Sequence, residues 1–174
     1  MTIEAKDLRK MFGKNEVVRG ASFVIPEGQT VGLLAPNGAG KTTTINMMLG
    51  LLKPISGSVT IFGRPVLGLP AALKSKIGYV PQDMAFFPEL SGLANVTYRG
   101  RLYGLRGAEL KAAVQESLEF TQLWDRRKDA AKSYSGGMQR RLNISCGIVY
   151  KPNPYFKVEA QHSCIPIETQ PLTQ

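Results

Sequence analysis

The sequence predicts an α/β fold, and three features of the chain lead to this prediction. Segment 29–35, "QTVGLLA", is short and almost wholly apolar, which is typical of a strand buried on both faces of a sheet. A Gly-rich turn and an amphipathic helical segment follow it directly. Further strands come after that helix, and the order of strand, helix and strand indicates parallel pairing at the centre of the sheet.

The first half of the chain is expected to contain most of the sheet. Strands are predicted at residues 2–12, 17–25, 29–35, 57–63 and 76–82. After the Gly-rich turn, four apolar residues have helical spacing and predict a helix that Pro54 brings to an end: Ile45, Met48, Leu49 and Leu52.

The second half is expected to be mainly helical. Between residues 85 and 131, apolar side chains recur at helical spacing and strand-forming residues are few. A further helix is predicted from "SGGMQRRLNISCGIV" to Pro152, and beyond it the chain has several prolines and no clear period. We therefore divide the chain into an α/β core at 1–84, a helical subdomain at 85–131, a motif-bearing helix at 132–152 and an atypical tail at 153–174.

The composition is that of an ordinary soluble globular protein, 43% hydrophobic and 20% charged over 174 residues. Cys146 and Cys164 have neither metal-site nor redox spacing, which favours a reducing compartment. Since the sequence shows no secretion signal and no window of roughly 20 apolar residues, a cytoplasmic protein is expected. The net charge of +9 comes from lysines and arginines spread along the chain, which favours solvated faces over a nucleic-acid-binding surface.

The turn "PNGAGKT", residues 36–42, has the features of a phosphate-binding loop. Small residues let the backbone wrap closely, so that successive N–H groups point at a phosphate, and the following helix adds its positive N-terminal end. Lys41 can reach the terminal phosphates, and the Thr42 hydroxyl is placed to bind Mg²⁺. The P-loop pattern has glycine where this chain has Ala35. We expect that single methyl group to be tolerated, whereas Gly38 and Gly40 are required.

Four motifs in order resemble those of the ATP-binding subunit of an ABC transporter, most of all in bacterial multidrug-export systems, over residues 1 to about 152. They are "MFGKNEVVRGASF", "APNGAGKTTT", "IGYVPQD" and "SYSGGMQRR". The resemblance implies a P-loop NTPase core with a mainly parallel sheet, an N-terminal antiparallel β part and a helical subdomain. It also implies ATP and Mg²⁺ as ligands, and a peripheral place on the inner face of the cell membrane. The implied partners are a transmembrane permease subunit and a second ATP-binding subunit.

The resemblance implies roles for individual residues. Phe12 would stack on adenine, and Val17 would lie beside the ribose. Lys41 would act in catalysis together with Gln82, which in the family reaches the Mg²⁺ and the γ-phosphate and begins the segment that touches the membrane partner. Thr42 and Gln82 would hold the metal. The phosphates would be bound by the turn and the start of the helix: Asn37, Gly38, Ala39, Gly40, Lys41, Thr42 and Thr43.

The segment "SYSGGMQRR" resembles the signature motif of the family, with Tyr134 in place of leucine and Met138 in place of glutamine. Ser135, Gly136 and Gly137 would begin a helix whose N–H groups and dipole meet the nucleotide held by the second subunit. Two copies would then close head to tail on two ATP molecules.

The chain departs from the family after that helix, where an apolar strand should end in Asp-Glu and a switch histidine should follow. By position, the acidic pair falls on Val158 and Glu159, and Pro154 and Lys157 interrupt the strand that would direct Glu159. His162, the single histidine, stands too early for the switch. We therefore expect the C-terminal strands of the family to be missing, through truncation or alteration of the chain, and hydrolysis to be impaired.

Three other functions stay open. One is a working ABC ATPase completed by Glu159 or by acidic residues of a partner subunit. Another is an ABC-type ATPase acting on RNA or DNA, which the charge suggests, although the chain shows no aromatic and basic RNA-binding motif. The third is a regulatory fragment that pairs with a full-length subunit.

Overall fold

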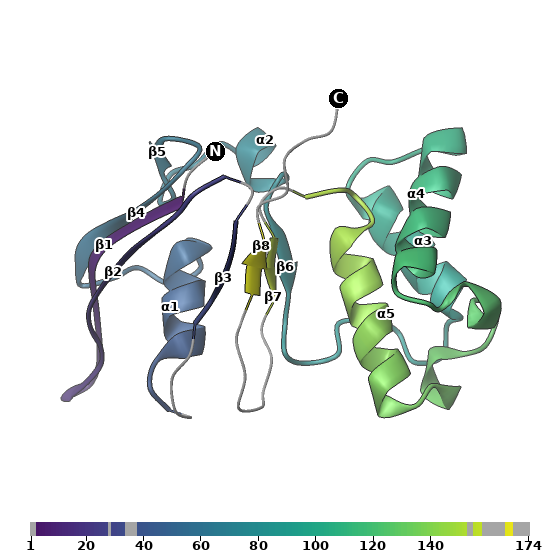
Figure 1. Cartoon of the computed structure of the whole chain (residues 1–174), viewed down its shortest axis with the longest axis horizontal. Helices are drawn as coiled ribbons and strands as arrows, with labels where there is room; N and C mark the ends of the chain where they lie inside the picture. The colour runs from purple at the N-terminus through teal and green to yellow at the C-terminus, as the bar shows by residue number, and fades with distance from the viewer. Residues whose placement is uncertain (1–2, 28, 34–37, 153–154, 158–165, 169–174) are drawn as a thin grey trace. The chain divides into compact units, whose positions relative to one another are not determined.

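The computed structural model describes residues 3–27, 29–33, 38–152, 155–157 and 166–168 (Figure 1). It has two compact units, one formed by residues 1–77 with 158–174 and the other by residues 78–157. The first unit carries the N-terminal strands and the helix after the Gly-rich turn, and the second carries the helices of the second half. The predicted α/β class, with its antiparallel N-terminal part and its helical subdomain, is confirmed.

An antiparallel sheet forms the N-terminal part of the first unit. In sheet order its strands are β2 (Asn15–Ile25), β1 (Ile3–Phe12), β4 (Ser56–Ile61) and β5 (Arg64–Pro65). The pairing of β1 with β2 shifts in register between Ala5 and Leu8, where Asp7 has a φ of +43°. Ala5 and Leu8 are both buried although they are three residues apart. The bulge therefore resets the alternation of β1 and keeps Leu8 on the same buried face as Ile3 and Ala5.

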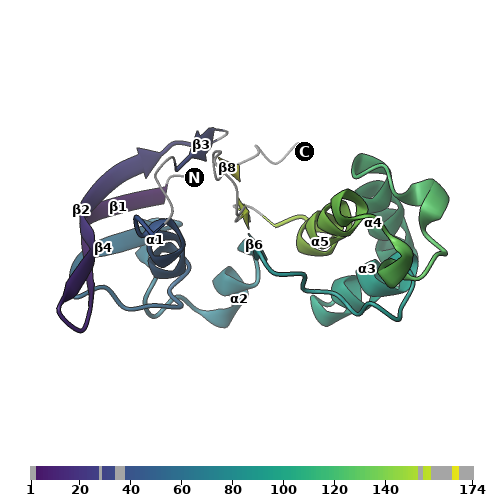
Figure 2. The same ribbon diagram turned by 90° about the horizontal axis from the view of Figure 1, so that it is seen from below.

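Helix α1 (Lys41–Met48) contacts β1 and β2 within this unit, as the two views in Figures 1 and 2 show. Its buried residues are Thr44, Ile45, Met47 and Met48. The expectation that Pro54 ends this helix was wrong, because the helix ends at Met48 and Leu52 lies outside it. Gly50 has a φ of +70°, a left-handed conformation that glycine adopts readily and that commonly ends a helix.

Each unit also contains a short strand pair. In the first unit β3 (Thr30–Gly32) pairs with β8 (Pro166–Glu168) in the antiparallel direction, and a short helix α2 (Ala71–Lys74) lies before the second unit. In the second unit β6 (Gly78–Val80) pairs with β7 (Tyr155–Lys157) in parallel. The parallel pairing expected from the sequence is therefore present between β6 and β7, whereas β3 and the N-terminal strands pair antiparallel.

The segment after Pro152 contains more regular structure than its composition indicated. Residues 155–157 and 166–168 are strands, so a short strand that includes Lys157 forms directly after Pro154, where an interrupted strand was expected. Pro154 comes before β7 and Pro166 is the first residue of β8, a position where a strand tolerates proline. Val158, Glu159 and His162 lie outside the described residues.

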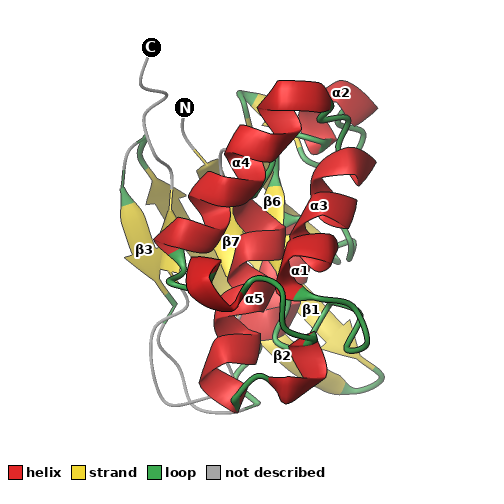
Figure 3. Cartoon of the chain, turned by 90° about the vertical axis from the view of Figure 1, so that its right-hand side faces the viewer, coloured by secondary structure: helices red, strands yellow, loops and turns green. Residues whose placement is uncertain are grey.

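Three α-helices and two short 3-10 helices make up most of the described second unit. They are α3 (Gly92–Leu102), α4 (Gly107–Phe120), η1 (Trp124–Arg126), η2 (Ala131–Ser133) and α5 (Gly136–Ile148). Each α-helix of this unit contacts the other two (Figure 3). In the described part of the chain, none of the helices has both the length and the apolarity needed to cross a membrane.

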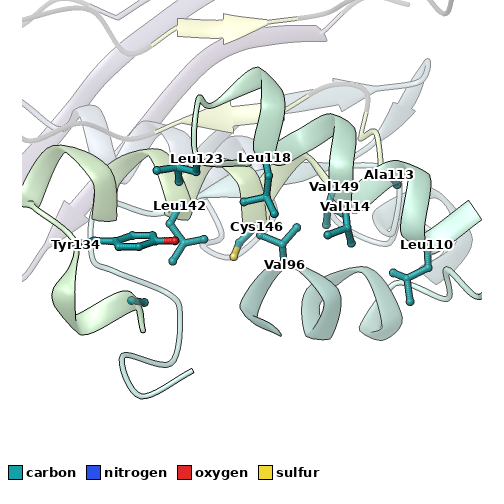
Figure 4. Packing of buried hydrophobic residues seen from close by; sticks show 11 residues of the cluster. Val96, Leu110, Ala113, Val114, Leu118, Leu123, Tyr134, Leu142, Cys146 and Val149 are labelled. Carbon is teal, nitrogen blue, oxygen red and sulfur yellow. The ribbon is translucent and has the colours of Figure 1, made fainter. Parts of the chain in front are cut away.

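A cluster of buried side chains joins these helices (Figure 4). Its burial supplies the dominant favourable term in the stability of the unit, about 25 cal/mol for each Å² of apolar surface removed from water. The members are Val96, Leu110, Ala113, Val114, Leu118, Leu123, Ala131, Tyr134, Leu142, Cys146 and Val149.

Candidate functional site

The Gly-rich turn before α1 has a backbone that favours glycine at two positions. Gly38 and Gly40 have φ values of +82° and +84°, in the left-handed region. A Cβ atom on Gly40 would lie 2.5 Å from the Val17 carbonyl oxygen and 3.0 Å from Val18 Cγ2. On Gly38 it would meet nothing within 4 Å, so there the requirement is conformational alone. Strand β2 therefore lies directly against the turn at Gly40.

The N-terminal end of α1 is suited to an anion. Gly40 is the N-cap, no side chain caps the helix, and its first turn has no acidic residue. The positive end of the helix dipole therefore has no negative charge from its own turn. Lys41 is half-buried and Thr42 is exposed, whereas the Thr44 hydroxyl donates to the Gly40 carbonyl oxygen at 2.9 Å. A phosphate group fits this combination of glycine, helix end and lysine.

The other residues predicted for the turn add less to this fit. Ala39 is exposed and Thr43 is half-buried. Ala35 and Asn37 lie outside the described residues. Among the described residues, the features that suit a phosphate therefore lie within segment 38–44.

The β1–β2 hairpin adds an accessible aromatic ring to the first unit. Phe12 ends β1 and is 52% exposed. The Lys10 ammonium lies 5.7 Å from the centroid of its ring, within the range of a cation–π contact. Val17 is half-buried on β2, and its carbonyl is the group that Gly40 approaches. The hairpin thus contacts the turn through Val17 and leaves the Phe12 ring accessible to a planar ligand.

Gln82 lies in the second unit, after the end of β6, and is exposed. The backbone on which it sits is held by α5. The Arg140 guanidinium donates to the carbonyl oxygen of Pro81 at 3.2 Å and to that of Gln82 at 2.8 Å.

Asn143, one turn further along α5, holds the same loop more fully. Its side-chain Nδ2 donates to the carbonyl oxygens of Pro81 at 2.9 Å and Asp83 at 3.2 Å, and its Oδ1 accepts from the Ala85 N–H at 3.0 Å. Asn143 is 2% exposed. This residue was not predicted from the sequence. The available signal was an asparagine within an apolar helical pattern, because a buried amide requires partners.

The turn that begins α5 is open on its outer side. Ser135 is the N-cap, and its hydroxyl accepts from the Met138 N–H at 3.3 Å. Gly136 and Gly137 are exposed, and a Cβ on either would meet nothing within 4 Å. The first turn has no acidic residue. This helix end can therefore also accept an anion from outside the unit.

Tyr134, which stands where the family resemblance predicts leucine, belongs to the buried cluster. It is 4% exposed, and its hydroxyl donates to the Arg126 carbonyl oxygen at 2.7 Å. Burial raises the pKa of the Tyr134 hydroxyl, and the nearby Asp129 carboxylate raises it further, although Arg126 opposes this. The tyrosine side chain is thus packed inside the helical unit, away from the exposed Gly136 and Gly137.

An apolar groove of about 300 Å³ lies between α3 and the loop that follows Gln82. Four of its lining residues are between 44% and 61% exposed: Met84, Phe87, Tyr98 and Leu102. Cys146 also contributes to the lining, but its burial raises the pKa of the thiol to about 12, so it stays protonated at neutral pH. The groove therefore exposes hydrophobic side chains without a reactive thiolate, and the polar residues Asn95 and Arg99 also line it.

A family model described as "ABC transporter" matches residues 18–156 of the chain. The linearmycin resistance ATP-binding protein LnrL of Bacillus subtilis (strain 168) is 42% identical over 150 residues, which are 86% of this chain and 48% of that protein. The doxorubicin resistance ATP-binding protein DrrA of Mycobacterium tuberculosis (strain ATCC 25618 / H37Rv) is 37% identical over 158 residues, 90% of this chain and 48% of that protein. The chain spans about half the length of the curated relatives it matches.

Solved structures show the same likeness. An ATP-binding subunit of an ABC transporter matches with a TM-score of 0.77 at 28% identity, over 90% of this chain and 65% of that one. The protein cbiO1 from Clostridium perfringens, described as part of the ABC transporter complex cbiONQ, matches with a TM-score of 0.79 at 23% identity. That match covers 89% of this chain and 64% of cbiO1, and it concerns the fold alone.

Proposed function

The chain belongs to the ABC transporter family, and we propose that it binds Mg·ATP as part of the energising subunit of a membrane exporter. One observation carries the proposal. The turn at Gly40 packs so closely on the Val17 carbonyl that a side chain is excluded, and it leads into a helix end that no side chain caps. Such a turn exposes backbone N–H groups to a ligand phosphate.

We assign the nucleotide to residues of the first unit. The N–H groups of residues 38–43 and the Lys41 ammonium would hold the phosphates, and the Thr42 hydroxyl would bind the Mg²⁺. The exposed Phe12 ring would stack on the base, with Val17 next to the ribose. When bound, Mg²⁺ neutralises charge on the phosphates during phosphoryl transfer. The role of Gln82 at the metal and the γ-phosphate stays a prediction from the family resemblance.

A second ATP-binding subunit would use the turn at the start of α5. Gly136 and Gly137 leave space on the outer side of the helix end, and no acidic residue lies in its first turn. We propose that Ser135, Gly136 and Gly137 contact the nucleotide held by that subunit, in a homodimer or a heterodimer.

The permease subunit would contact the apolar groove of the second unit. Met84, Phe87, Tyr98 and Leu102 expose hydrophobic surface there, immediately after the loop with Gln82. An apolar helix or loop of a membrane protein would cover this surface. The relatives LnrL and DrrA are both named as drug-resistance ATP-binding proteins, which supports export as the process and the inner face of the membrane as the location.

Hydrolysis is proposed to be impaired, on the basis of the sequence after Pro152. The positions expected for the acidic pair, Val158 and Glu159, and the single histidine His162 are outside the described residues. A phosphate-release assay, run on the same preparation as the binding titration, decides between an ATP-binding subunit and a working ATPase.

The proposal is tested by calorimetric titration of Mg·ATP into wild-type protein, Lys41→Ala and the control Lys74→Ala. Lys74 is an exposed lysine of α2 in the same unit. We expect Lys41→Ala to weaken binding about 10- to 150-fold, because a hydrogen bond to a charged group contributes about 1.5–3 kcal/mol. Lys74→Ala should bind like the wild type. The proposal is refuted if the folded wild-type chain does not bind Mg·ATP, or if Lys41→Ala binds it equally well.

A further inference from the structure

The loop from Pro81 to Phe87 is held by side chains from two helices of the second unit. Asn143 and Arg140 of α5 bind its first half, as described above. From α3, Arg99 donates to the Ala85 carbonyl oxygen at 3.0 Å. Thus the Ala85 peptide is bound on both sides, its N–H by α5 and its carbonyl by α3.

Asn95 of α3 binds the second half of the loop. Its Oδ1 accepts from the Phe87 N–H at 2.7 Å, and its Nδ2 donates to the Phe87 carbonyl oxygen at 2.9 Å. Like Asn143, it is 2% exposed. Both asparagines therefore use donor and acceptor atoms of one buried amide on loop backbone, which is how a buried polar side chain fixes irregular structure.

The position of Asn143 follows from the close packing of α5 on β6. Gly147 lies one turn after Asn143, and a Cβ on Gly147 would collide with Val80 Cγ2, at the end of β6. The helix backbone therefore approaches the strand end closely. This approach brings the short Asn143 side chain within hydrogen-bond distance of the Pro81 carbonyl.

We propose that Asn143 is a positioning residue that fixes the loop carrying Gln82 to the signature helix α5, so that the loop and the helix move as one body. The proposal rests on the proposed function for the roles of Gln82 and of the signature turn. It deepens that function by making Asn143 a link between them. A shift of α5 is then passed to the backbone of residues 81–85 directly, and from there to the apolar groove.

Ser145 provides a matched control on the same helix. It is 0% exposed, and its hydroxyl lies 2.6 Å from the Thr121 hydroxyl and donates to the Ser117 carbonyl oxygen at 3.3 Å. The same hydroxyl also lies within hydrogen-bond distance of the Arg141 carbonyl oxygen, at 3.2 Å within α5. None of these groups belongs to the loop. Ser145→Ala thus removes buried hydrogen bonds of α5 and leaves those to residues 81–85 in place.

Amide hydrogen exchange of the full chain tests the anchoring. We expect Asn143→Ala to raise exchange at the Ala85 N–H at least about tenfold, with the mid-helix amides of α5 affected no more than in Ser145→Ala. Asn143→Asp keeps an acceptor for this N–H and loses both donors, so it should restore part of the protection at Ala85. Unchanged exchange at Ala85 in Asn143→Ala, or an equal rise in Ser145→Ala, overturns the proposal.

The wild-type chain gives a measurement that does not depend on variant folding. The Ala85 and Phe87 amides both donate to buried side-chain oxygens, so they should exchange at least about a hundredfold more slowly than unprotected amides. Exchange near the unprotected rate at Ala85 overturns the proposal.

Nucleotide binding provides a measurement that Asn143 would leave unchanged if it only stabilised the fold. We expect Asn143→Ala and Gln82→Ala each to reduce the factor by which Mg²⁺ strengthens ATP binding, with ATP affinity in the absence of Mg²⁺ unchanged. Ser145→Ala should keep the wild-type factor. If only Gln82→Ala reduces it, the link through Asn143 is refuted. If the wild type does not bind ATP at all, the proposed function fails, and the exchange comparison still decides whether Asn143 anchors the loop.

Discussion

Gly40→Ala is expected to destabilise the first unit more than Gly38→Ala does, although both glycines have nearly the same φ. The left-handed conformation costs an alanine about 1–2 kcal/mol, and this cost applies to both variants. At Gly38 no atom lies within 4 Å of the new Cβ, so we expect about 1–2 kcal/mol in total. The difference between the variants therefore reports the close approach of β2.

The additional cost at Gly40 follows from the distances. A new Cβ would lie 2.5 Å from the Val17 carbonyl oxygen and 3.0 Å from Val18 Cγ2, and the nearer of these is backbone that a rotamer change cannot move. Overpacking of this kind costs about 1–3 kcal/mol. Gly40→Ala should therefore lose about 2–5 kcal/mol of stability and shift the hairpin away from the turn.

The assay must report on the first unit. Trp124 is the single tryptophan and lies in the second unit, so its fluorescence serves as the internal control. Urea unfolding is followed instead by hydrogen exchange at β1, β2 and the Thr44 amide, which donates to the Gly40 carbonyl oxygen at 2.8 Å. Equal losses in the two variants would show that the contact with β2 has no energetic weight, and the reasoning for Gly40 would be wrong.

Two further predictions concern the second unit. Gly92→Ala should cost about 1–3 kcal/mol of stability, because the new Cβ would collide with the Tyr134 hydroxyl. In a Tyr134→Phe background this loss should be smaller, which a double-mutant cycle of urea unfolding midpoints would measure. Additive effects of the two substitutions would contradict the clash. Burial raises the pKa of the Cys146 thiol from 9.0 to about 12. The preference of the folded state for the protonated thiol therefore contributes fully to stability below about pH 9 and is lost as the pH rises towards 12. The contribution is about 4 kcal/mol at most. Urea titrations at several alkaline pH values should therefore show a weaker pH dependence in Cys146→Ala, and an unchanged dependence would refute the assignment.

Local patterns in the sequence predicted the elements whose structure is determined by residues close to one another in the chain. The apolar run at 29–35 and the glycines after it identified β3 and the turn before α1, because an apolar run and a left-handed backbone each restrict residue type. The expectation that this strand is buried on both faces was wrong for its described part, since Val31 is half-buried and Gly32 is exposed. The end of α1 was mispredicted because the proline at position 54 is a strong signal, whereas Gly50, which ends the helix, is a weaker one. The strand at 155–157 was missed because three residues carry too little periodicity to be recognised.

Long-range polar contacts were beyond prediction from the pattern. Asn143 lies 62 residues from Pro81 in the sequence, and helical periodicity indicates that position 143 is on an inner face without indicating which carbonyl it binds. The contact of Tyr134 spans only eight residues, but the pattern likewise does not indicate that its hydroxyl donates to the Arg126 carbonyl oxygen at the end of η1. In both cases the partner is a backbone carbonyl oxygen. Because every residue has one, the sequence does not indicate which carbonyl the side chain binds.

The distance of Asn143 from its loop along the chain has a consequence during protein synthesis. At about 5–20 residues per second, Asn143 is added roughly 3–12 s after Pro81. Asn95 and Arg99 are added much sooner, so the half of the loop near Phe87 can settle on α3 while residues 81–85 still lack their second anchor. A nascent chain in this interval presents that segment, which includes the exposed Met84, to chaperones and proteases. Slower translation between positions 85 and 143 would therefore lengthen the vulnerable interval without changing a single residue.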